Sequence, residues 1–360
     1  MSERIGIVTG GGDCPGLNAV IRAVAKAAAK RGWESIGFLG GYEGILEPQR
    51  YIQLDYQQLG SLLTRGGTIL GTANRGRFSA KVGHGETRRL PQELIDGVKA
   101  GMQKLNIRAL VSIGGDGSLS IGQQLFEGGV PLVGVPKTID NDLEGTVTTF
   151  GFDSAVACAT DALDRLHTTA ESHNRVMVLE VMGRYAGWIA LYAGVAGGAD
   201  VILIPEIPFT YDSICAKIQQ REQADKHFTL IIAAEGAREK GGEFVTAADQ
   251  VVNREARLGG ISNVVAAEVE KRTGKEARAC VLGHLQRGGS PTNFDRALCT
   301  IFGAEAVELI AAGKYGQMVA YQGFQVAAVE ITEAIGRLKT VSPTGSFVRT
   351  ARALGVRLGD

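Results

Sequence analysis

The sequence has no excess of either charge, since lysine plus arginine and aspartate plus glutamate are equal at 38 residues each. Proteins that bind nucleic acids or membrane surfaces usually carry a basic excess, so this balance argues against both kinds of partner. No apolar run is long enough to span a bilayer, and the first residues read as the start of a strand rather than as a signal peptide. We therefore expect a cytoplasmic protein.

Cysteine is scarce and shows no pairing pattern. An odd number of cysteines without a CxxC pair fits free thiols in a reducing compartment and gives no zinc-binding signature. The five residues are widely spaced, at positions 14, 158, 215, 280 and 299.

Glycine, in contrast, is abundant, with 50 residues that form neither a low-complexity tract nor a collagen period. The glycines cluster after apolar runs, where they suit backbone that approaches a ligand closely or turns through positive φ. The main clusters are GGGDCPG (10–16), GGT (66–68), GGDG (114–117) and HLQRGGSP (284–291).

Short apolar runs alternate with amphipathic stretches, as in IGIVT (5–9) followed by an expected helix at 17–31. Apolar runs separated by helices predict parallel strands covered on both faces. The predicted fold class is α/β, with two doubly wound, mostly parallel sheet domains and an active site in the cleft between them. Further strands are expected at 109–114, 131–136, 175–182, 200–205, 228–235 and 277–283, and a helix at 118–127.

The length of 360 residues exceeds the size at which one hydrophobic core usually keeps growing, so two domains are expected. No linker or internal repeat marks the boundary, and we place it near residue 150. Residues 1–150 would bind a phosphoryl donor and Mg²⁺, and 151–320 would bind a phosphorylated substrate. Residues 321–360 would return to the first domain.

Two glycine loops follow predicted strands and offer sites for phosphate. Gly10–Gly16 leads into a helix whose N–H groups and dipole attract anions, although a tight turn without a ligand is an alternative. This loop has neither the P-loop lysine nor the GxGxxG pattern. Gly114–Ser118 places Asp116 between glycines, and a carboxylate beside phosphate requires a bridging cation. Asp116 is therefore predicted to bind Mg²⁺, the alternative being that it caps the next helix.

The segment PKTIDND (136–142) places two carboxylates just past a predicted buried strand, where parallel sheets bind ligands. Transfer of a phosphoryl group to a hydroxyl needs a base, and a positioned carboxylate contributes roughly 10²–10⁴-fold. Asp140 and Asp142 would divide this work, and Thr138 would donate a hydrogen bond to the moving phosphoryl group. A turn rich in Asp and Asn without catalytic function is the alternative.

Four arginines and a histidine lie near the ends of predicted strands. A single arginine usually pairs with a surface carboxylate, and a single histidine is as often structural. Several forked donors together match the geometry of phosphate and favour a phosphorylated substrate. The residues are Arg175, Arg184, Arg278, His284 and Arg287.

These motifs together resemble the phosphofructokinase family. The resemblance covers roughly residues 4 to 310, with the motifs in the same order and at similar spacing. GGDG alone is not specific, since NAD and lipid kinases share it. The matching strings are GGDCPGLNAVIR, GGTILGT, SIGGDGS, PKTIDND, EVMGRYAGW and VLGHLQRGGSP.

The resemblance implies phosphoryl transfer from ATP, with Mg²⁺, to the 1-hydroxyl of fructose 6-phosphate, in glycolysis. It implies that Asp116 holds Mg²⁺ and that Asp140 is the base, helped by Thr138 and Asp142. Arg184 would stabilise the transferring phosphoryl group. The donor phosphates would be held by Gly12, Gly115, Gly117 and Ser118.

On the acceptor side, the resemblance implies that Met182, Gly183, Arg184 and Glu235 contact the sugar. His284 and Arg287 would bind the 6-phosphate, joined by Arg175 and Arg278. In the family the last two come from a neighbouring subunit, which implies a homo-oligomer, usually a tetramer.

The chain departs from the family pattern where the donor binds. It reads Asn74-Arg75 where relatives place an arginine, so either Arg75 contacts the donor or that contact is lost. Relatives that use pyrophosphate typically have aspartate at the position of Gly117 and lysine at that of Lys137, whereas ATP users typically have glycine at both. Gly117 leaves room for an α-phosphate, and Lys137 adds positive charge without necessarily blocking the nucleoside, so ATP is favoured.

A further departure concerns allosteric regulation. Arg22 is present, but Lys26, His167 and His227 stand where the family's effector site has arginine or lysine. Because imidazoles are mostly uncharged near neutral pH, we expect the usual effectors to act weakly or differently.

The sequence leaves three alternative functions. A pyrophosphate-dependent enzyme would run reversibly, and a non-catalytic sugar-phosphate sensor would be expected to lack Asp116 or Asp140. An NAD kinase would not account for PKTIDND, MGR and HLQRGGSP together.

Overall fold

The computed structural model describes residues 3–72, 76–78, 81–82, 86–246 and 258–360. The chain divides into two compact units. Unit 1 comprises Met1–Thr138, Leu143–Asp153 and Arg287–Leu338. Unit 2 comprises Ile139–Asp142, Ser154–Gln286 and Lys339–Asp360. Among the described residues, no helix combines the length and the apolar character needed to cross a membrane.

Unit 1 is built on a sheet of seven strands in the order β13-β12-β7-β6-β1-β2-β3. The five central strands pair in parallel, and β3 and β13 are antiparallel at the edges. The strands are β1 (Arg4–Thr9), β2 (Glu34–Phe38), β3 (Tyr51–Gln53), β6 (Ile107–Gly114), β7 (Leu132–Pro136), β12 (Gln317–Gln322) and β13 (Gln325–Glu330). A small separate hairpin is formed by β4 (Lys81–Val82) and β5 (Glu86–Thr87).

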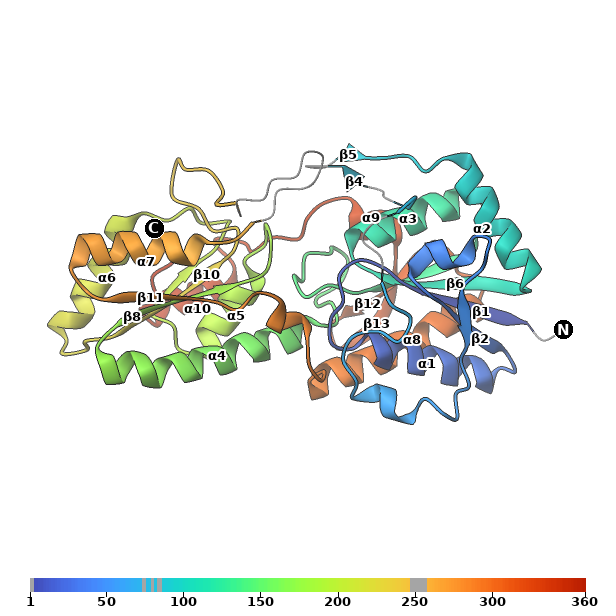
Figure 1. The fold of residues 1–360 in the computed structure, drawn as a ribbon, viewed down its shortest axis with the longest axis horizontal. Coiled ribbons are helices and arrows are strands. Elements are labelled where there is room, and N and C mark those ends of the chain that lie inside the picture. Colours follow the sequence, from blue (N-terminus) through green and yellow to red (C-terminus); the bar gives the residue numbers. More distant parts are fainter. Residues whose placement is uncertain (1–2, 73–75, 79–80, 83–85, 247–257) are drawn as a thin grey trace. The chain divides into compact units, whose positions relative to one another are not determined.

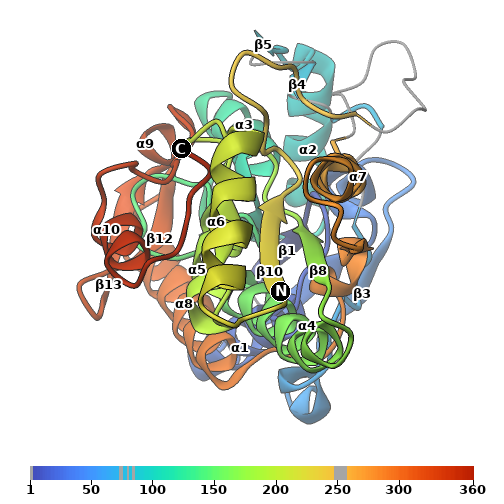
Figure 2. The same cartoon turned by 90° about the vertical axis from the view of Figure 1, so that its left-hand side faces the viewer.

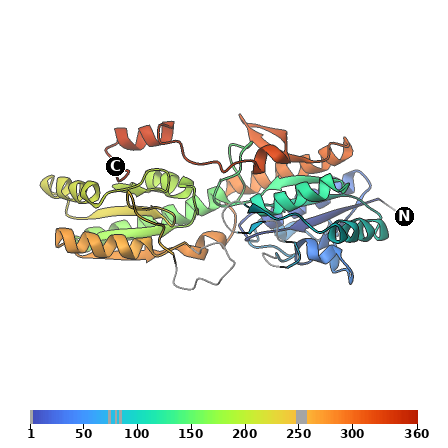
Figure 3. The same cartoon turned by 90° about the horizontal axis from the view of Figure 1, so that it is seen from above.

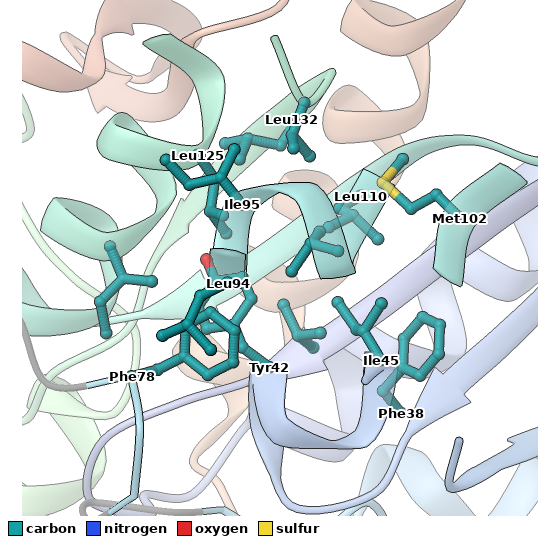
Figure 4. Packing of buried hydrophobic residues seen from close by; sticks show 14 of the residues in the cluster. Phe38, Tyr42, Ile45, Phe78, Leu94, Ile95, Met102, Leu110, Leu125 and Leu132 are labelled. Atoms are coloured by element: carbon teal, nitrogen blue, oxygen red, sulfur yellow. The ribbon is translucent and has the colours of Figure 1, made fainter. Parts of the chain in front are cut away.

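Helices cover both faces of this sheet, which explains why its central strands are apolar along their whole length. Figure 1 shows α2 (Gln92–Lys104) and α3 (Asp116–Glu127) on one side, with α1 (Leu17–Lys30) and α8 (Asn293–Ala311) on the other. The core on the α2 and α3 side includes Phe38, Leu110 and Leu132 (Figure 4). The short helices of this unit are η1 (Gly41–Ile45), η2 (Gly60–Leu63) and α9 (Ile331–Ile335).

Unit 2 is built on four parallel strands in the order β11-β8-β10-β9. Figure 2 shows β10 and β8 side by side within this unit. The strands are β8 (Val176–Val181), β9 (Val201–Leu203), β10 (Thr229–Ala234) and β11 (Ala277–Val281). The helices are α4 (Phe152–His173), α5 (Trp188–Ala196), α6 (Tyr211–Gln223), α7 (Ile261–Thr273), α10 (Ser346–Ala353) and the short η3 (Gly283–Arg287). Helix α4 starts in the last residues of the middle segment of unit 1.

The prediction of an α/β fold with mostly parallel sheets is confirmed, and each predicted strand lies within two residues of an observed one. The observed units differ from the predicted boundaries of 1–150, 151–320 and 321–360. Residues 287–338 lie in unit 1, because α8 packs closely on α1, where Gly303 leaves no room for a Cβ beside Ala23. Residues 339–360 lie in unit 2, because Arg357 hydrogen-bonds to the backbone of β9 at Ile202.

A buried carboxylate fixes the start of α7 in unit 2. Glu180, near the end of β8, is only 2% exposed. Its oxygens accept hydrogen bonds from the backbone N–H of Gly260 at 2.9 Å and from both the N–H and the hydroxyl of Ser262 at 2.9 Å. A buried charge is tolerated only when it is hydrogen-bonded in this way.

Replacing Glu180 by Ala should lower the free energy of unfolding by about 3 kcal/mol, because the donors at the start of α7 would lose their acceptor while staying buried. Chemical denaturation measures the change. Glu171→Ala, at an exposed position of α4, is the control and should have little effect. Equal stability of the two variants would contradict this account of Glu180.

Candidate functional site

Three neighbouring parallel strands of unit 1 bring the predicted donor-binding segments to one edge of the sheet. Thr9 of β1 pairs with Ile113 of β6, and Gly114 of β6 pairs with Pro136 of β7. The first glycine loop, the GGDGS loop and Lys137 each follow one of these strand ends. Ligands bind at this edge of open parallel sheets.

Ser118 lies between the two glycine loops and explains why both need glycine. A Cβ on Gly114 would lie 2.7 Å from the Ser118 hydroxyl, and a Cβ on Gly10 would lie 3.0 Å from the Ser118 Cβ. Ser118 itself is 7% exposed. The two loops therefore touch, and their backbone N–H groups belong to one site.

Lys137 joins the same two loops. Its backbone N–H donates to the carbonyl of Gly114 at 3.0 Å, and its ammonium group donates to the carbonyl of Gly12. A Cβ on Gly11 would lie 3.2 Å from the Lys137 Nζ atom. Lys137 is 4% exposed, so its positive charge is held inside the loops, where it favours an anionic ligand.

Arg287 lies against the first loop from its own segment of unit 1. Atoms Nη1 and Cζ of its guanidinium group would be 2.5 and 2.8 Å from a Cβ on Gly12, so a larger residue there would displace the guanidinium group. Its buried Nε atom has no hydrogen-bond acceptor among the residues that the structure describes. Arg287 is predicted to bind the 6-phosphate of the sugar, and within unit 1 its guanidinium group lies beside the loop that Lys137 contacts.

Asp116 is the first residue of α3, and the N-cap position before it is Gly115. Asp116 is therefore not the N-cap residue of α3, the role that the capping alternative gave it. A Cβ on Gly117 would meet no described heavy atom within 4 Å, so the space beside Asp116 is open. In the described part of the chain no three His, Cys, Asp or Glu residues form a metal cluster. One carboxylate can bind Mg²⁺ together with the phosphate oxygens of a ligand, which is the arrangement predicted for Asp116.

A pocket beside the GGDGS loop was not predicted from the sequence. It encloses about 290 Å³, including space open to solvent. The rings of Tyr42 and Phe78 lie 5.5 Å apart in its wall, and the Tyr42 hydroxyl is 2.6 Å from that of Ser112. The lining residues are Gly10, Gly40, Gly41, Tyr42, Glu43, Phe78, Ser118 and Ile121. The local signal for this pocket is GGYEG (40–44), in which an aromatic residue stands between glycines after β2.

An ion pair lies next to this pocket. Glu43 accepts hydrogen bonds from the backbone N–H and the guanidinium group of Arg77, at 2.6 and 2.8 Å. Partial burial alone would raise the pKa of Glu43, but the bonds from Arg77 lower that pKa overall. The predicted donor contact by Arg75, and its neighbour Asn74, lie outside the described residues.

The acidic segment after β7 is buried. Asp140 is 7% exposed and Asn141 is 3% exposed. Asn141 has a φ of 53°, a left-handed conformation that a residue other than glycine adopts only when its surroundings hold it. Asp142 follows Asn141 in unit 2, whereas Thr138 belongs to unit 1. The carbonyl of Thr138 accepts a hydrogen bond from the Thr149 hydroxyl at 2.7 Å.

Four of the predicted sugar-binding residues lie together at the carboxyl ends of β8 and β10. The Glu235 carboxylate accepts a hydrogen bond from the backbone N–H of Arg184 at 3.1 Å, and the Glu235 N–H donates to Val181 at 2.8 Å. Gly183 and Arg184 both have positive φ, at 137° and 49°. Met182 precedes them, so the turn presents these side chains from one edge of the sheet in unit 2.

Arg175 and Arg278 lie at the other end of the same strands. Arg175 precedes β8, and Arg278 pairs in register with Met177. Both guanidinium groups form ion pairs with Glu276. The six residues of β8 that separate Arg175 from Met182 correspond to roughly 20 Å of extended chain. His284 lies in the exposed η3 turn after β11.

Comparisons with known proteins point to one family. Residues 4–310 match the family model described as Phosphofructokinase. The ATP-dependent 6-phosphofructokinase of Chloroflexus aurantiacus is 52% identical over 99% of this chain and 98% of its own length. The pyrophosphate–fructose 6-phosphate 1-phosphotransferase of Streptomyces coelicolor is 47% identical, over 94% of this chain and 96% of its own length. The T-state phosphofructokinase structure from Pichia pastoris has a TM-score of 0.79 and 30% identity, covering 93% of this chain and 36% of that one.

Proposed function

The chain belongs to the phosphofructokinase family, and from that premise we propose how its residues transfer the γ-phosphoryl group of ATP to the 1-hydroxyl of fructose 6-phosphate. The product is fructose 1,6-bisphosphate, and the reaction is a phosphotransfer of glycolysis. The residue roles below are proposals that rest on the contacts described above.

The observation that carries the choice of ATP is the open space at Gly117, where a Cβ would meet no described heavy atom within 4 Å. This space leaves room for an α-phosphate, which pyrophosphate lacks. The relative that is 52% identical is also named as ATP-dependent.

The donor phosphates would bind to the N–H groups of the loops around Gly12 and Gly115–Ser118. Lys137 would neutralise their charge from inside the first loop. Asp116 would hold Mg²⁺, which when bound supplies positive charge to the phosphate oxygens that gain charge during transfer. The half-buried position of Asp116 at the start of α3 leaves its carboxylate accessible to such a complex.

Asp140 would accept the proton of the attacking 1-hydroxyl, with Thr138 and Asp142 assisting. Burial of Asp140 excludes water that would compete for this proton. Arg184 would stabilise the transferring phosphoryl group, because its backbone is fixed by Glu235. Met182, Gly183 and Glu235 would contact the sugar.

We also propose a homotetramer. Arg175 and Arg278 lie at the far end of β8 and β11 from Met182, so within unit 2 they cannot reach the sugar that Met182 contacts. They would instead bind the 6-phosphate held by a neighbouring subunit, whose His284 and Arg287 share that role. The free cysteines fit work in the reducing cytoplasm.

A coupled assay that supplies ATP or pyrophosphate in turn, with fructose 6-phosphate and Mg²⁺, tests the donor. We expect turnover with ATP and at least about tenfold less with pyrophosphate. The variant Gly117→Asp should lose most of its activity with ATP, because a carboxylate in the open space would repel the α-phosphate. Turnover with pyrophosphate alone in the parent protein would favour the alternative donor that Lys137 and the Streptomyces relative point to.

A further inference from the structure

The segment Lys339–Val341 has no role in the proposals above, yet in unit 2 it contacts the acidic segment that contains Asp140. It belongs to the C-terminal part of the chain, red in Figure 3, which continues into α10. This region lies beyond residue 310, where the family model ends. The residues of this segment therefore lie outside the region that the family model covers.

Lys339 holds the acidic segment at two points. Its backbone N–H donates to the carbonyl of Asp142 at 2.9 Å, and its ammonium group donates to the side-chain oxygen of Asn141 at 2.9 Å. Asn141 is the residue with left-handed backbone, directly after Asp140. Residues other than glycine adopt this conformation less readily, and neighbouring groups stabilise it. Lys339 is one of those groups.

The same segment is anchored on its other side to the loop after β8. The carbonyl of Lys339 accepts a hydrogen bond from the indole N–H of Trp188 at 2.9 Å, and the Lys339 ammonium group lies 5.7 Å from the Trp188 ring. The N–H of Val341 donates to Glu206 at 2.8 Å, and Glu206 also accepts the N–H of Gly187 at 3.0 Å. The tail thus connects the acidic segment to the loop that begins at Arg184.

We propose that Lys339 is a positioning residue for phosphoryl transfer, which it serves by fixing Asn141 and thereby the backbone that orients Asp140. The inference rests on the proposed function of Asp140. A base that is misplaced by about 1 Å can lower the rate by roughly 10²-fold, while the binding groups elsewhere are unaffected. Lys339 touches neither substrate nor phosphate in this role.

The test compares Lys339→Met with Lys339→Arg in steady-state assays of the full chain, using ATP, fructose 6-phosphate and Mg²⁺. We expect Lys339→Met to lower kcat by about 10-fold or more, with both KM values within about threefold. Lys339→Arg keeps a charged donor and should recover a large part of kcat. The matched control is Lys217→Met, which also removes an ammonium group that donates to the tail, at Gly355, but far along the chain from Lys339.

The outcomes separate the inference from the proposed function. Absence of product from the parent protein would contradict the proposed function itself. An unchanged kcat in Lys339→Met, or an equal loss in Lys217→Met, would overturn the positioning role. If Lys339→Met does not fold, Lys339→Gln is assayed by the same criteria, and failure of both to fold would overturn the proposal in favour of a structural role.

Discussion

Replacing Asp140 by Asn should lower kcat at least about 10²-fold, while the Kd of fructose 6-phosphate changes little. The amide keeps the size of the side chain, which is 7% exposed, but cannot take the proton of the attacking hydroxyl. Steady-state assays give kcat, and calorimetric titration with the sugar phosphate gives Kd. The large effect should therefore appear in turnover and not in binding.

The control for this variant is Asp212→Asn, which makes the same chemical change at an exposed ion pair with Arg272 in unit 2. It should keep nearly full activity. If Asp140→Asn turned over at the rate of this control, Asp140 would not be the base. A variant that lost both turnover and sugar binding would instead indicate that Asp140 maintains the structure of the segment.

Replacing Asp116 by Asn should lower kcat/KM for the donor by about 10²–10³-fold, because a neutral amide is a weak ligand for Mg²⁺. The concentration of Mg²⁺ that gives half-maximal activity should rise at the same time. Both are measured by varying Mg²⁺ at several fixed concentrations of ATP. Asp116 lies in the first turn of α3, and thermal unfolding checks that the variant keeps its stability.

Asp55→Asn is the matched control for Asp116, since its exposed carboxylate in unit 1 accepts hydrogen bonds from the nearby Gln57 and Gln58. It should leave the Mg²⁺ dependence unchanged. An Asp116→Asn variant with an unaltered Mg²⁺ requirement would remove Asp116 from the metal site.

The strands and the glycine loops could be predicted because their signals are local. A buried parallel strand is apolar along its length, as in IRALVSIG of β6, and glycine is required where Ser118 crowds the backbone. The strands β12 and β13 escaped prediction, since each has an apolar run of only four residues, MVAY in β12 and VAAV in the edge strand β13. Pairing with β7 decides their place in the sheet, and that pairing is not local.

The missed parts of the site depend on contacts between distant segments. Tyr42 and Phe78 form a pocket wall although 36 residues separate them, and neither belongs to a phosphate-binding motif. The contact of Arg287 with Gly12 and that of Lys339 with Asn141 join segments far apart in the chain. For the same reason the unit boundaries differ from those predicted, because the packing of α8 and of the tail decides them.

The central claim is that this chain moves the γ-phosphoryl group of ATP to the 1-hydroxyl of fructose 6-phosphate. Phosphorus NMR of a reaction containing ATP, fructose 6-phosphate and Mg²⁺ tests it most directly, because the new phosphate ester is assigned to a carbon of the sugar. The account predicts ADP and a phosphate ester at carbon 1, formed in equal amounts. Hydrolysis of ATP without a new ester, or an ester at another carbon, would contradict it.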